Sequence, residues 1–328
     1  MTSDSRFQRH PPSDGPVFPD GGALPDGPVL RCGLVGTGHW ARNTHAVALA
    51  SADGIEFTAV WGRNPAAARA IADAHGARAY PELDAFLNGV DAVVFSVPPH
   101  VQSEIATRAA AAGKHLLLEK PIALTEAAAD ALVRAVEATG VASVVFFTNR
   151  FQPQIRAWLT EVAGSGSAWC GGSAAWLGSS LDESNPFNTP WRQQKGGLWD
   201  LGPHIVSMLW AALGPVVSVT ADTGRADVTH LVLHHAGGAS STATVTLNAP
   251  PAADSVELSL WGETGRSAAP MGERDAVPAL RTALRELADN ARSGRMEHPC
   301  DVRFGRDVLR VLAEAERQVE ARSANRLS

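Results

Sequence analysis

A glycine-rich turn between an apolar strand and a helix is the feature that most constrains the fold of this chain. Residues 29–35 are apolar and β-prone, and they lead into Gly36-x-Gly38-x-x-Ala41 and a helical run to residue 50. The first glycine permits a tight turn, the second lets the backbone approach a pyrophosphate, and alanine in the third position allows close helix–strand packing. The free N–H groups and positive dipole at the helix start favour phosphate binding. The spacing predicts a dinucleotide site, against the alternative of a turn that serves packing only.

Strands and helices alternate from this turn to residue 150. Thr125 is placed to cap the helix that ends at Gly140, because its hydroxyl can accept a free backbone N–H. The alternation predicts an α/β Rossmann domain over residues 29–150, with a doubly wound parallel sheet and right-handed crossovers. The expected strands are 56–61, 91–97, 114–118 and 141–148, and the expected helices include 66–75 and 101–112.

The pattern changes after residue 150. Residues 216–260 contain several β-rich runs broken by Gly and Pro, without helices between them. Such a pattern is typical of a largely antiparallel sheet. Helical stretches at about 278–292 and 303–321 close the chain. We therefore expect residues 151–328 to form a second α/β domain that binds substrate and carries the oligomer contacts.

Composition narrows the partners. Residues 1–28 are dominated by Pro, Gly, Asp and Ser, which predicts a flexible tail. The net charge of −6 gives no basic footprint for nucleic acid or an anionic membrane. No apolar run approaches the roughly 20 residues that span a bilayer, and no secretory signal is recognisable. Three widely spaced cysteines form neither a disulfide framework nor a metal knuckle, so we expect a cytoplasmic protein without a metal site.

The end of the second strand bears on cofactor preference. NAD sites usually place an acidic side chain there for the ribose 2′-hydroxyl, whereas this chain has Gly62 and Arg63. No carboxylate is present to repel a 2′-phosphate, and Arg63 is available to bind one. We therefore expect NADP to be the preferred cofactor; the alternative is that both NADP and NAD bind. The expected cofactor-binding residues are Gly36, Thr37, Gly38, His39, Trp40, Gly62, Arg63, Asn64, Pro98, His100, Glu119 and Lys120.

Several segments, taken in order along the chain, match the motifs of one family. They are the Gly36 turn with His45, Pro98-Pro99-His100 with Glu104, Ala112 to Pro121, Asn149-Arg150-Phe151-x-Pro153, Gly196 to His204, and Leu213-Gly214. On these segments, residues 30–322 resemble the glucose–fructose oxidoreductase, inositol dehydrogenase and rhizopine-catabolism (Gfo/Idh/MocA) family. The resemblance implies a Rossmann domain followed by a domain on an open mixed sheet, and reversible oxidation of a sugar or cyclitol hydroxyl. Two positions depart from the family: Ser207 stands where Asp is common, and Gln102 where His is frequent.

Three residues are candidates for the chemistry. Lys120 follows a strand at the carboxyl edge of the parallel sheet, where its ammonium can stabilise a developing alkoxide. Asp200 and His204 are four residues apart, so on a helix they share a face, with His204 as proton acceptor and Asp200 as the orienting carboxylate. The structural alternatives are that Asp200 caps a helix, that His204 packs in the core, and that Lys120 pairs with its neighbour Glu119. The expected substrate-binding residues are Lys120, Arg150, Trp191, Trp199, Asp200 and His204.

These features predict an oxidoreductase that transfers a hydride between NADP(H) or NAD(H) and a secondary hydroxyl or ketone of a sugar, aminosugar or cyclitol. A redox-assisted glycoside hydrolase with bound NAD is one alternative. A cofactor-sensing regulatory protein without catalysis is another. Because residues 216–260 have few helices to cover both faces of a sheet, we also expect a homodimer or homotetramer formed through that sheet.

Overall fold

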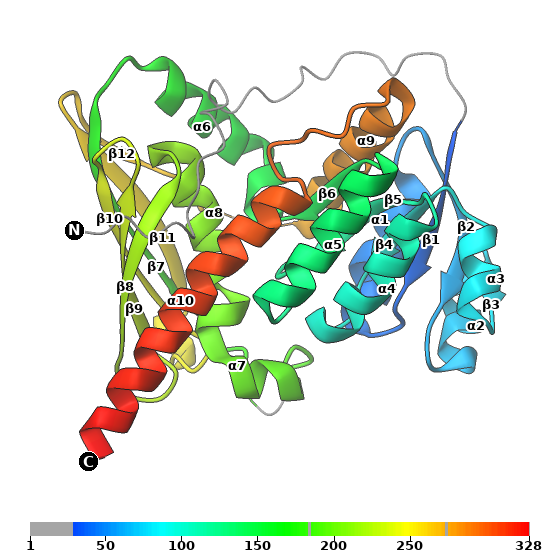
Figure 1. Ribbon diagram of the computed structural model, residues 1–328, viewed down its shortest axis with the longest axis horizontal. Helices are drawn as coiled ribbons and strands as arrows, with labels where there is room; N and C mark the ends of the chain where they lie inside the picture. Colours follow the sequence, from blue (N-terminus) through cyan, green and yellow to red (C-terminus); the bar gives the residue numbers. More distant parts are fainter. Residues whose placement is uncertain (1–28, 183–184, 273–274, 328) are drawn as a thin grey trace. The chain divides into compact units, whose positions relative to one another are not determined.

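The computed structural model describes residues 29–182, 185–272 and 275–327, which divide into two compact units (Figure 1). The Rossmann unit contains residues 29–152 and 275–309. The mixed-sheet unit contains the described residues between 153 and 272 together with 310–327. The predicted tail over residues 1–28 lies outside the described residues.

The Rossmann unit is built on a six-stranded parallel sheet in the order β3-β2-β1-β4-β5-β6. This order reverses beside β1, so the crossovers before and after the reversal lie on opposite faces, which confirms the doubly wound fold. Strands β4 and β6 are buried at every position. The strands are β1 (Leu30–Val35), β2 (Ile55–Trp61), β3 (Arg78–Tyr80), β4 (Ala92–Phe95), β5 (His115–Glu119) and β6 (Ser143–Phe146).

Helices cover both faces of this sheet (Figure 1). Helices α4 and α5 pack together on one face, and α1 packs with α9 on the other. The Thr125 hydroxyl accepts a hydrogen bond from Ala128 N at 3.2 Å, as expected of the cap of α5. The helical elements are η2 (Ala41–His45), α1 (Ala46–Ser51), α2 (Pro65–His75), α3 (Leu83–Asn88), α4 (Pro99–Ala111), α5 (Glu126–Thr139), η3 (Thr148–Phe151) and α9 (Ala276–Ser293).

Helix α9 belongs to the Rossmann unit, although the sequence places it beyond residue 150 in the second domain. Its buried face packs against β5, β6 and α1. The segment after it extends the edge of the sheet: Val145 N donates to Cys300 O at 2.7 Å, and Val302 N donates to Ser143 Oγ at 3.1 Å. An amphipathic pattern predicts that a helix has a buried face but does not identify the sheet that covers it.

The mixed-sheet unit has a second six-stranded sheet, in the order β12-β11-β7-β10-β9-β8. Its only parallel pairing among the described strands is β7 with β10, so it is largely antiparallel, as predicted. Helix α8 packs on β7 and β10 and also contacts α6. The elements are α6 (Pro153–Gly164), β7 (Trp169–Leu177), α7 (Pro190–Asp200), α8 (Gly202–Leu213), β8 (Val216–Thr223), β9 (Thr229–His235), β10 (Ser240–Thr246), η4 (Pro251–Ala253), β11 (Ser255–Gly262), β12 (Gly265–Ala268) and α10 (Val302–Leu327), which begins in the Rossmann unit.

The face of this sheet away from α8 is accessible. Along β9 buried and exposed residues alternate, with His230, Val232 and His234 exposed. Their register partners on β10, Thr244, Thr242 and Ser240, carry hydroxyls. Trp261 on β11 and Val232 are 39% and 38% exposed, and they give this face two apolar points in a surface otherwise rich in Ser, Thr and His. The exposed face is therefore more polar than the apolar sheet surface that the sequence suggests.

Candidate functional site

The turn after β1 has the shape that a dinucleotide requires. Gly36 has φ +132°, and a Cβ there would lie 2.2 Å from the backbone oxygen of Ser96, so no side chain fits. The N–H of Gly36 donates to Trp61 O at 2.9 Å, which places the turn among the carboxyl ends of β1, β2 and β4. A Cβ on Gly38 would meet no atom within 4 Å, so open space lies in front of the turn, where the helical residues begin at His39. Open space at the start of a helix, at the point where strand order reverses, fits a pyrophosphate.

Glu119 ties this turn to the end of β5. Its Oε1 accepts a hydrogen bond from Trp40 Nε1 at 2.8 Å. The Nε2 of His45, which is completely buried, lies 3.2 Å from the same oxygen, a contact that is ionic only when the imidazole is protonated. Glu119 Oε2 accepts from the backbone N–H of Lys120 at 3.3 Å. The expected cofactor residues Trp40, Glu119 and Lys120 are thus held together by this one carboxylate.

Gln102 fixes the chain on the other side of Glu119, and the sequence did not predict this role. Its buried side-chain amide donates from Nε2 to Glu119 O at 2.7 Å and accepts at Oε1 from Glu119 N at 2.8 Å. Nε2 also lies 3.3 Å from Pro121 O, just beyond the cis peptide bond between Lys120 and Pro121. The amide acts as donor and acceptor at once, and so binds both backbone polar groups of Glu119.

The second expected cofactor loop follows β2. A Cβ on Gly62 would lie 2.6 Å from Cγ2 of Thr37, so Thr37 occupies the space that a side chain at position 62 would need. Arg63 is exposed and forms no hydrogen bond or ion pair with any residue in the described part of the chain. Asn64 Oδ1 accepts from Ala67 N at 3.1 Å and caps α2, so one of its polar atoms is already used.

Of the remaining expected cofactor residues, two follow β4 and one follows β1. Pro98 is the N-cap of α4, and its carbonyl accepts from the N–H groups of Val101 and Gln102. His100 is exposed in the first turn of that helix. His39, in the turn after β1, is exposed and lies 3.0 Å from Asn43 Nδ2 through its Nδ1. Pro98 and His100 follow the carboxyl end of β4, and His39 follows that of β1. All three therefore lie at the same edge of the sheet as Gly36.

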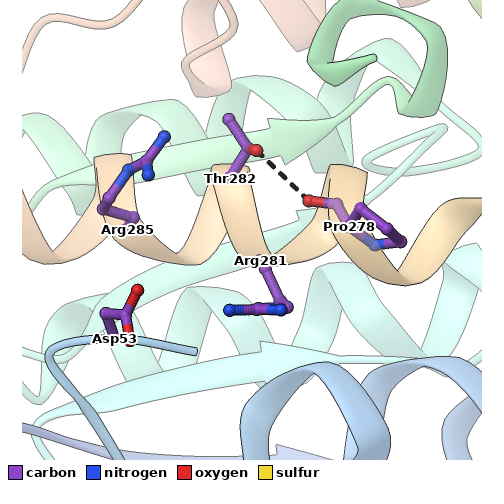
Figure 2. Close-up of a pocket in the computed structure, with 5 residues that line it drawn as sticks. All are labelled: Asp53, Pro278, Arg281, Thr282 and Arg285. Atoms are coloured by element: carbon purple, nitrogen blue, oxygen red, sulfur yellow. Dashed lines mark hydrogen bonds between the residues drawn. The ribbon is translucent and has the colours of Figure 1, made fainter. Parts of the chain in front are cut away.

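A hollow of about 130 Å³ lies elsewhere in the Rossmann unit, and Figure 2 shows the residues that line it. Asp53 precedes β2, so this hollow is at the amino edge of the sheet, opposite the edge that carries Gly36 and Gly62. Sites for drug-sized ligands usually measure about 300–1,000 Å³. The hollow is therefore not the nucleotide site. It is lined by Asp53, Pro278, Arg281, Thr282 and Arg285.

In the mixed-sheet unit, a bend brings Gly196 and Gly197 onto the sheet. Gly196 has φ 63° and ψ −163° and interrupts α7. A Cβ on Gly197 would lie 2.7 Å from Thr246 Cα, so the chain touches β10 directly. Asp227 Oδ2 accepts from Gly197 N and from Leu247 N, both at 2.8 Å, while Oδ1 accepts from the Thr246 hydroxyl. No sequence motif pointed to Asp227.

Asp200 and His204 lie just after this bend, at the end of α7 and in the first turn of α8, and each is 6% exposed. Asp200 Oδ2 accepts from Arg192 Nε at 2.8 Å. The ring of His204 lies 5.1 Å from that of Trp176, tilted by 37°. Arg192 and Trp176 are therefore contacts of the candidate catalytic pair that the sequence did not identify. The hydroxyl of Ser207 donates to His204 O at 2.8 Å.

Trp199 and Trp191, both expected to bind substrate, lie in different surroundings. Trp199 is only 1% exposed, and its Nε1 donates to Glu316 Oε1 at 2.9 Å, so it is a core residue of the mixed-sheet unit and has no open face for a sugar. Its expected role in substrate binding is therefore corrected. Trp191 is partly exposed, with the Arg192 guanidinium 4.8 Å from its ring centre. Arg150 is buried in the Rossmann unit, 5.6 Å from the ring centre of Phe304, and its substrate role stays a prediction.

The described residues contain no group of three or more His, Cys, Asp or Glu side chains placed to hold a metal ion. Within the same residues, no helix has both the length and the apolar character needed to cross a bilayer.

Two family models match the chain. Residues 30–147 match the model described as "Oxidoreductase family, NAD-binding Rossmann fold", and residues 172–268 match the GFO/IDH/MocA C-terminal domain. Among solved structures, GenD2 from gentamicin A biosynthesis in complex with NAD superposes with a TM-score of 0.79 at 23% identity, over 91% of this chain and 97% of that one. At that identity the likeness concerns the fold.

Curated relatives align over shorter segments. Inositol 2-dehydrogenase of Rhizobium meliloti is 34% identical over 39% of this chain and 39% of its own length. UDP-N-acetylglucosamine 3-dehydrogenase of Acidithiobacillus ferrooxidans is 32% identical over 39% of this chain and 40% of its own. D-apiose dehydrogenase of Paraburkholderia graminis is 30% identical over 63% of this chain and 58% of its own. The chain thus spans less than two thirds of these relatives. With both family models matched in order, the chain belongs to the Gfo/Idh/MocA family of oxidoreductases.

Proposed function

We propose that this chain is a dehydrogenase that uses NADP, with NAD as the weaker cofactor, and acts on a secondary hydroxyl or ketone of a sugar, aminosugar or cyclitol. The observation that carries the proposal is the turn at Gly36 and Gly38, which closes tightly on the Ser96 backbone and leaves open space at the start of a helix. Gly36 to Trp40 would hold the pyrophosphate, and the ends of β2, β4 and β5 would hold the rest of the dinucleotide.

The chemical roles follow from the side chains present. A bound nicotinamide cofactor would supply hydride transfer to or from the carbon that carries the reacting hydroxyl or ketone. Lys120 donates a hydrogen bond to the reacting oxygen and stabilises negative charge that develops there. His204 takes the hydroxyl proton, and Asp200 orients the site. Trp176 packs against the His204 ring and restricts its orientation. Arg150 and Trp191 complete the proposed substrate contacts.

The named relatives support a polyhydroxylated substrate, because they act on inositol, UDP-N-acetylglucosamine and D-apiose. The test is a screen of these three compounds and simple hexoses with NADP⁺ and with NAD⁺, followed by the absorbance of reduced nicotinamide. Net cofactor reduction supports the proposal. Product release without net reduction would instead indicate redox-assisted glycoside cleavage, and cofactor binding without any turnover would indicate a regulatory protein.

The cofactor preference makes a separate prediction. We expect NADP to bind roughly tenfold to a hundredfold more tightly than NAD, the effect of about 1.5–3 kcal/mol from a charge-assisted bond between Arg63 and the 2′-phosphate. The substitution Arg63→Ala should remove this preference, as measured by calorimetric titration of the variant with each cofactor. Arg69→Ala, which removes another exposed arginine from α2, is the matched control and should keep it. Equal affinities for the two cofactors in the wild type would contradict the prediction.

We also propose a homodimer or homotetramer formed through the exposed face of the mixed sheet. Val232 and Trp261 supply apolar contacts on this face, and His230 and His234 supply polar ones. Light scattering of Val232→Glu should show a smaller assembly than the wild type, since the variant places a charge on the buried surface. Val47→Glu, at a 39% exposed valine of α1, is the control. A wild-type monomer of 34.4 kDa at micromolar concentration would refute the assignment.

A further inference from the structure

Arg192 and Asp200 form an ion pair that a continuous helix could not make. They are 8 residues apart, and in an α-helix with a rise of about 1.5 Å per residue their Cα atoms would be separated by about 12 Å along the axis. In the structure Arg192 Nε lies 2.8 Å from Asp200 Oδ2. The difference is produced by Gly196, whose φ of 63° and ψ of −163° turn the chain between the two residues.

Contacts with the sheet, separate from the ion pair, also hold the bend. Asp227 accepts hydrogen bonds from Gly197 N and Leu247 N at 2.8 Å, and so joins the residue after the bend to the end of β10. The Cβ position of Gly197 is 2.7 Å from Thr246 Cα, which excludes any side chain there. The backbone that leads to Asp200 is therefore held by contacts that do not involve Arg192.

Arg192 is held on several sides. Its guanidinium carbon lies 4.8 Å from the ring centre of Trp191 and 5.6 Å from that of Phe187. Its Nη1 lies 3.3 Å from Phe187 O and 3.5 Å from Thr189 Oγ1. The side chains of Arg192 and Asp200 are only 19% and 8% exposed. A guanidinium fixed in this way can hold a buried carboxylate in one orientation, whereas removing one partner of a buried pair leaves the other charge uncompensated.

We propose that Arg192 is the positioning residue of Asp200: across the Gly196 bend it fixes the direction of the carboxylate that precedes His204 by one helical turn. Arg192 acts through Asp200 and does not touch the reacting atoms. The proposal rests on the proposed function for its kinetic consequence and on the contacts above for its structural one.

The kinetic test is a double-mutant cycle with whichever polyol of the screen is turned over. Arg192→Gln should lower kcat at least roughly tenfold while leaving NADP affinity unchanged. The double variant Arg192→Gln/Asp200→Asn should match Asp200→Asn alone within about twofold, because the two residues act as a unit. Arg192→Lys, which keeps the charge, should recover part of kcat. Lys195→Gln, which removes the 2.9 Å pair with Glu316 from the same helix, should stay within about twofold of the wild type.

Two kinetic results would overturn the proposal: a wild-type kcat in Arg192→Gln, or effects of the two single variants that multiply in the double variant. A crystal structure of Arg192→Gln decides independently of turnover. The expected result is an Asp200 carboxylate that has left its wild-type position while the Gly196 bend and the Asp227 contacts are unchanged. An unmoved carboxylate would overturn the positioning role even if no polyol is turned over, whereas absence of wild-type turnover alone would contradict only the proposed function.

Discussion

Lys120→Ala and His204→Ala are each expected to lower turnover by at least about a hundredfold while leaving NADP affinity nearly intact, since acid–base assistance is typically worth about 10²–10⁴ in rate. Lys120→Ala removes the donor to the reacting oxygen, and His204→Ala removes the proton acceptor beside Trp176. Steady-state kcat with the substrate found in the screen gives the first quantity, and calorimetric titration of NADP gives the second.

A matched control separates this chemistry from a general loss of structure. His75→Ala removes a histidine from the end of α2, where its ring contacts Phe57 at a centroid distance of 5.8 Å. It should keep wild-type kcat. If Lys120→Ala and His204→Ala also kept near wild-type turnover on a confirmed substrate, the assignment of these residues would be wrong.

The two glycines of the turn are expected to fail in different ways when replaced by alanine. Gly36→Ala places a Cβ 2.2 Å from Ser96 O at a φ of +132°, so it should lower the free energy of unfolding. Overpacking and backbone strain of this kind typically cost about 1–3 kcal/mol each. Gly38→Ala meets no protein atom within 4 Å, so it should leave the free energy of unfolding nearly unchanged but weaken NADP binding at least about tenfold. Urea denaturation and calorimetry measure the two quantities.

The contrast between the two variants is the informative result. A Gly38→Ala protein that binds NADP as tightly as the wild type would show that the open space at this turn does not receive the pyrophosphate. A Gly36→Ala protein of unchanged stability would show that the turn can move away from the Ser96 backbone.

The local sequence pattern was sufficient to predict most strands and helices of the Rossmann unit, because buried parallel strands appear in a sequence as apolar runs separated by amphipathic helices. Strand β3, Arg78–Tyr80, was missed because three partly exposed residues carry no such pattern. Helix α9 was assigned to the second domain for another reason. Its buried face, which includes Leu280, Leu284 and Leu287, is evident from periodicity, but its packing partner is a long-range property.

The sequence predicted which residues belong to the candidate site, but not which residues contact them. Asp200 and His204 were identified from their spacing, yet the bend at Gly196 and the Asp227 contacts that fix it arise from loops far apart in the sequence. The bend also decides the neighbours of Asp200: Arg192 reaches it across Gly196, while the adjacent Trp199 turns into the core toward Glu316. Proximity to a motif in sequence therefore did not indicate proximity to the site.

The most direct test of the proposed function is the reduction of NADP⁺ by the purified protein with myo-inositol, UDP-N-acetylglucosamine, D-apiose and common hexoses, recorded as the absorbance of reduced nicotinamide. Net reduction that grows in proportion to oxidised product, faster with NADP⁺ than with NAD⁺ at subsaturating cofactor, is the predicted result. Tight NADP binding without net reduction by any of these compounds, in either direction of the reaction, would contradict the account.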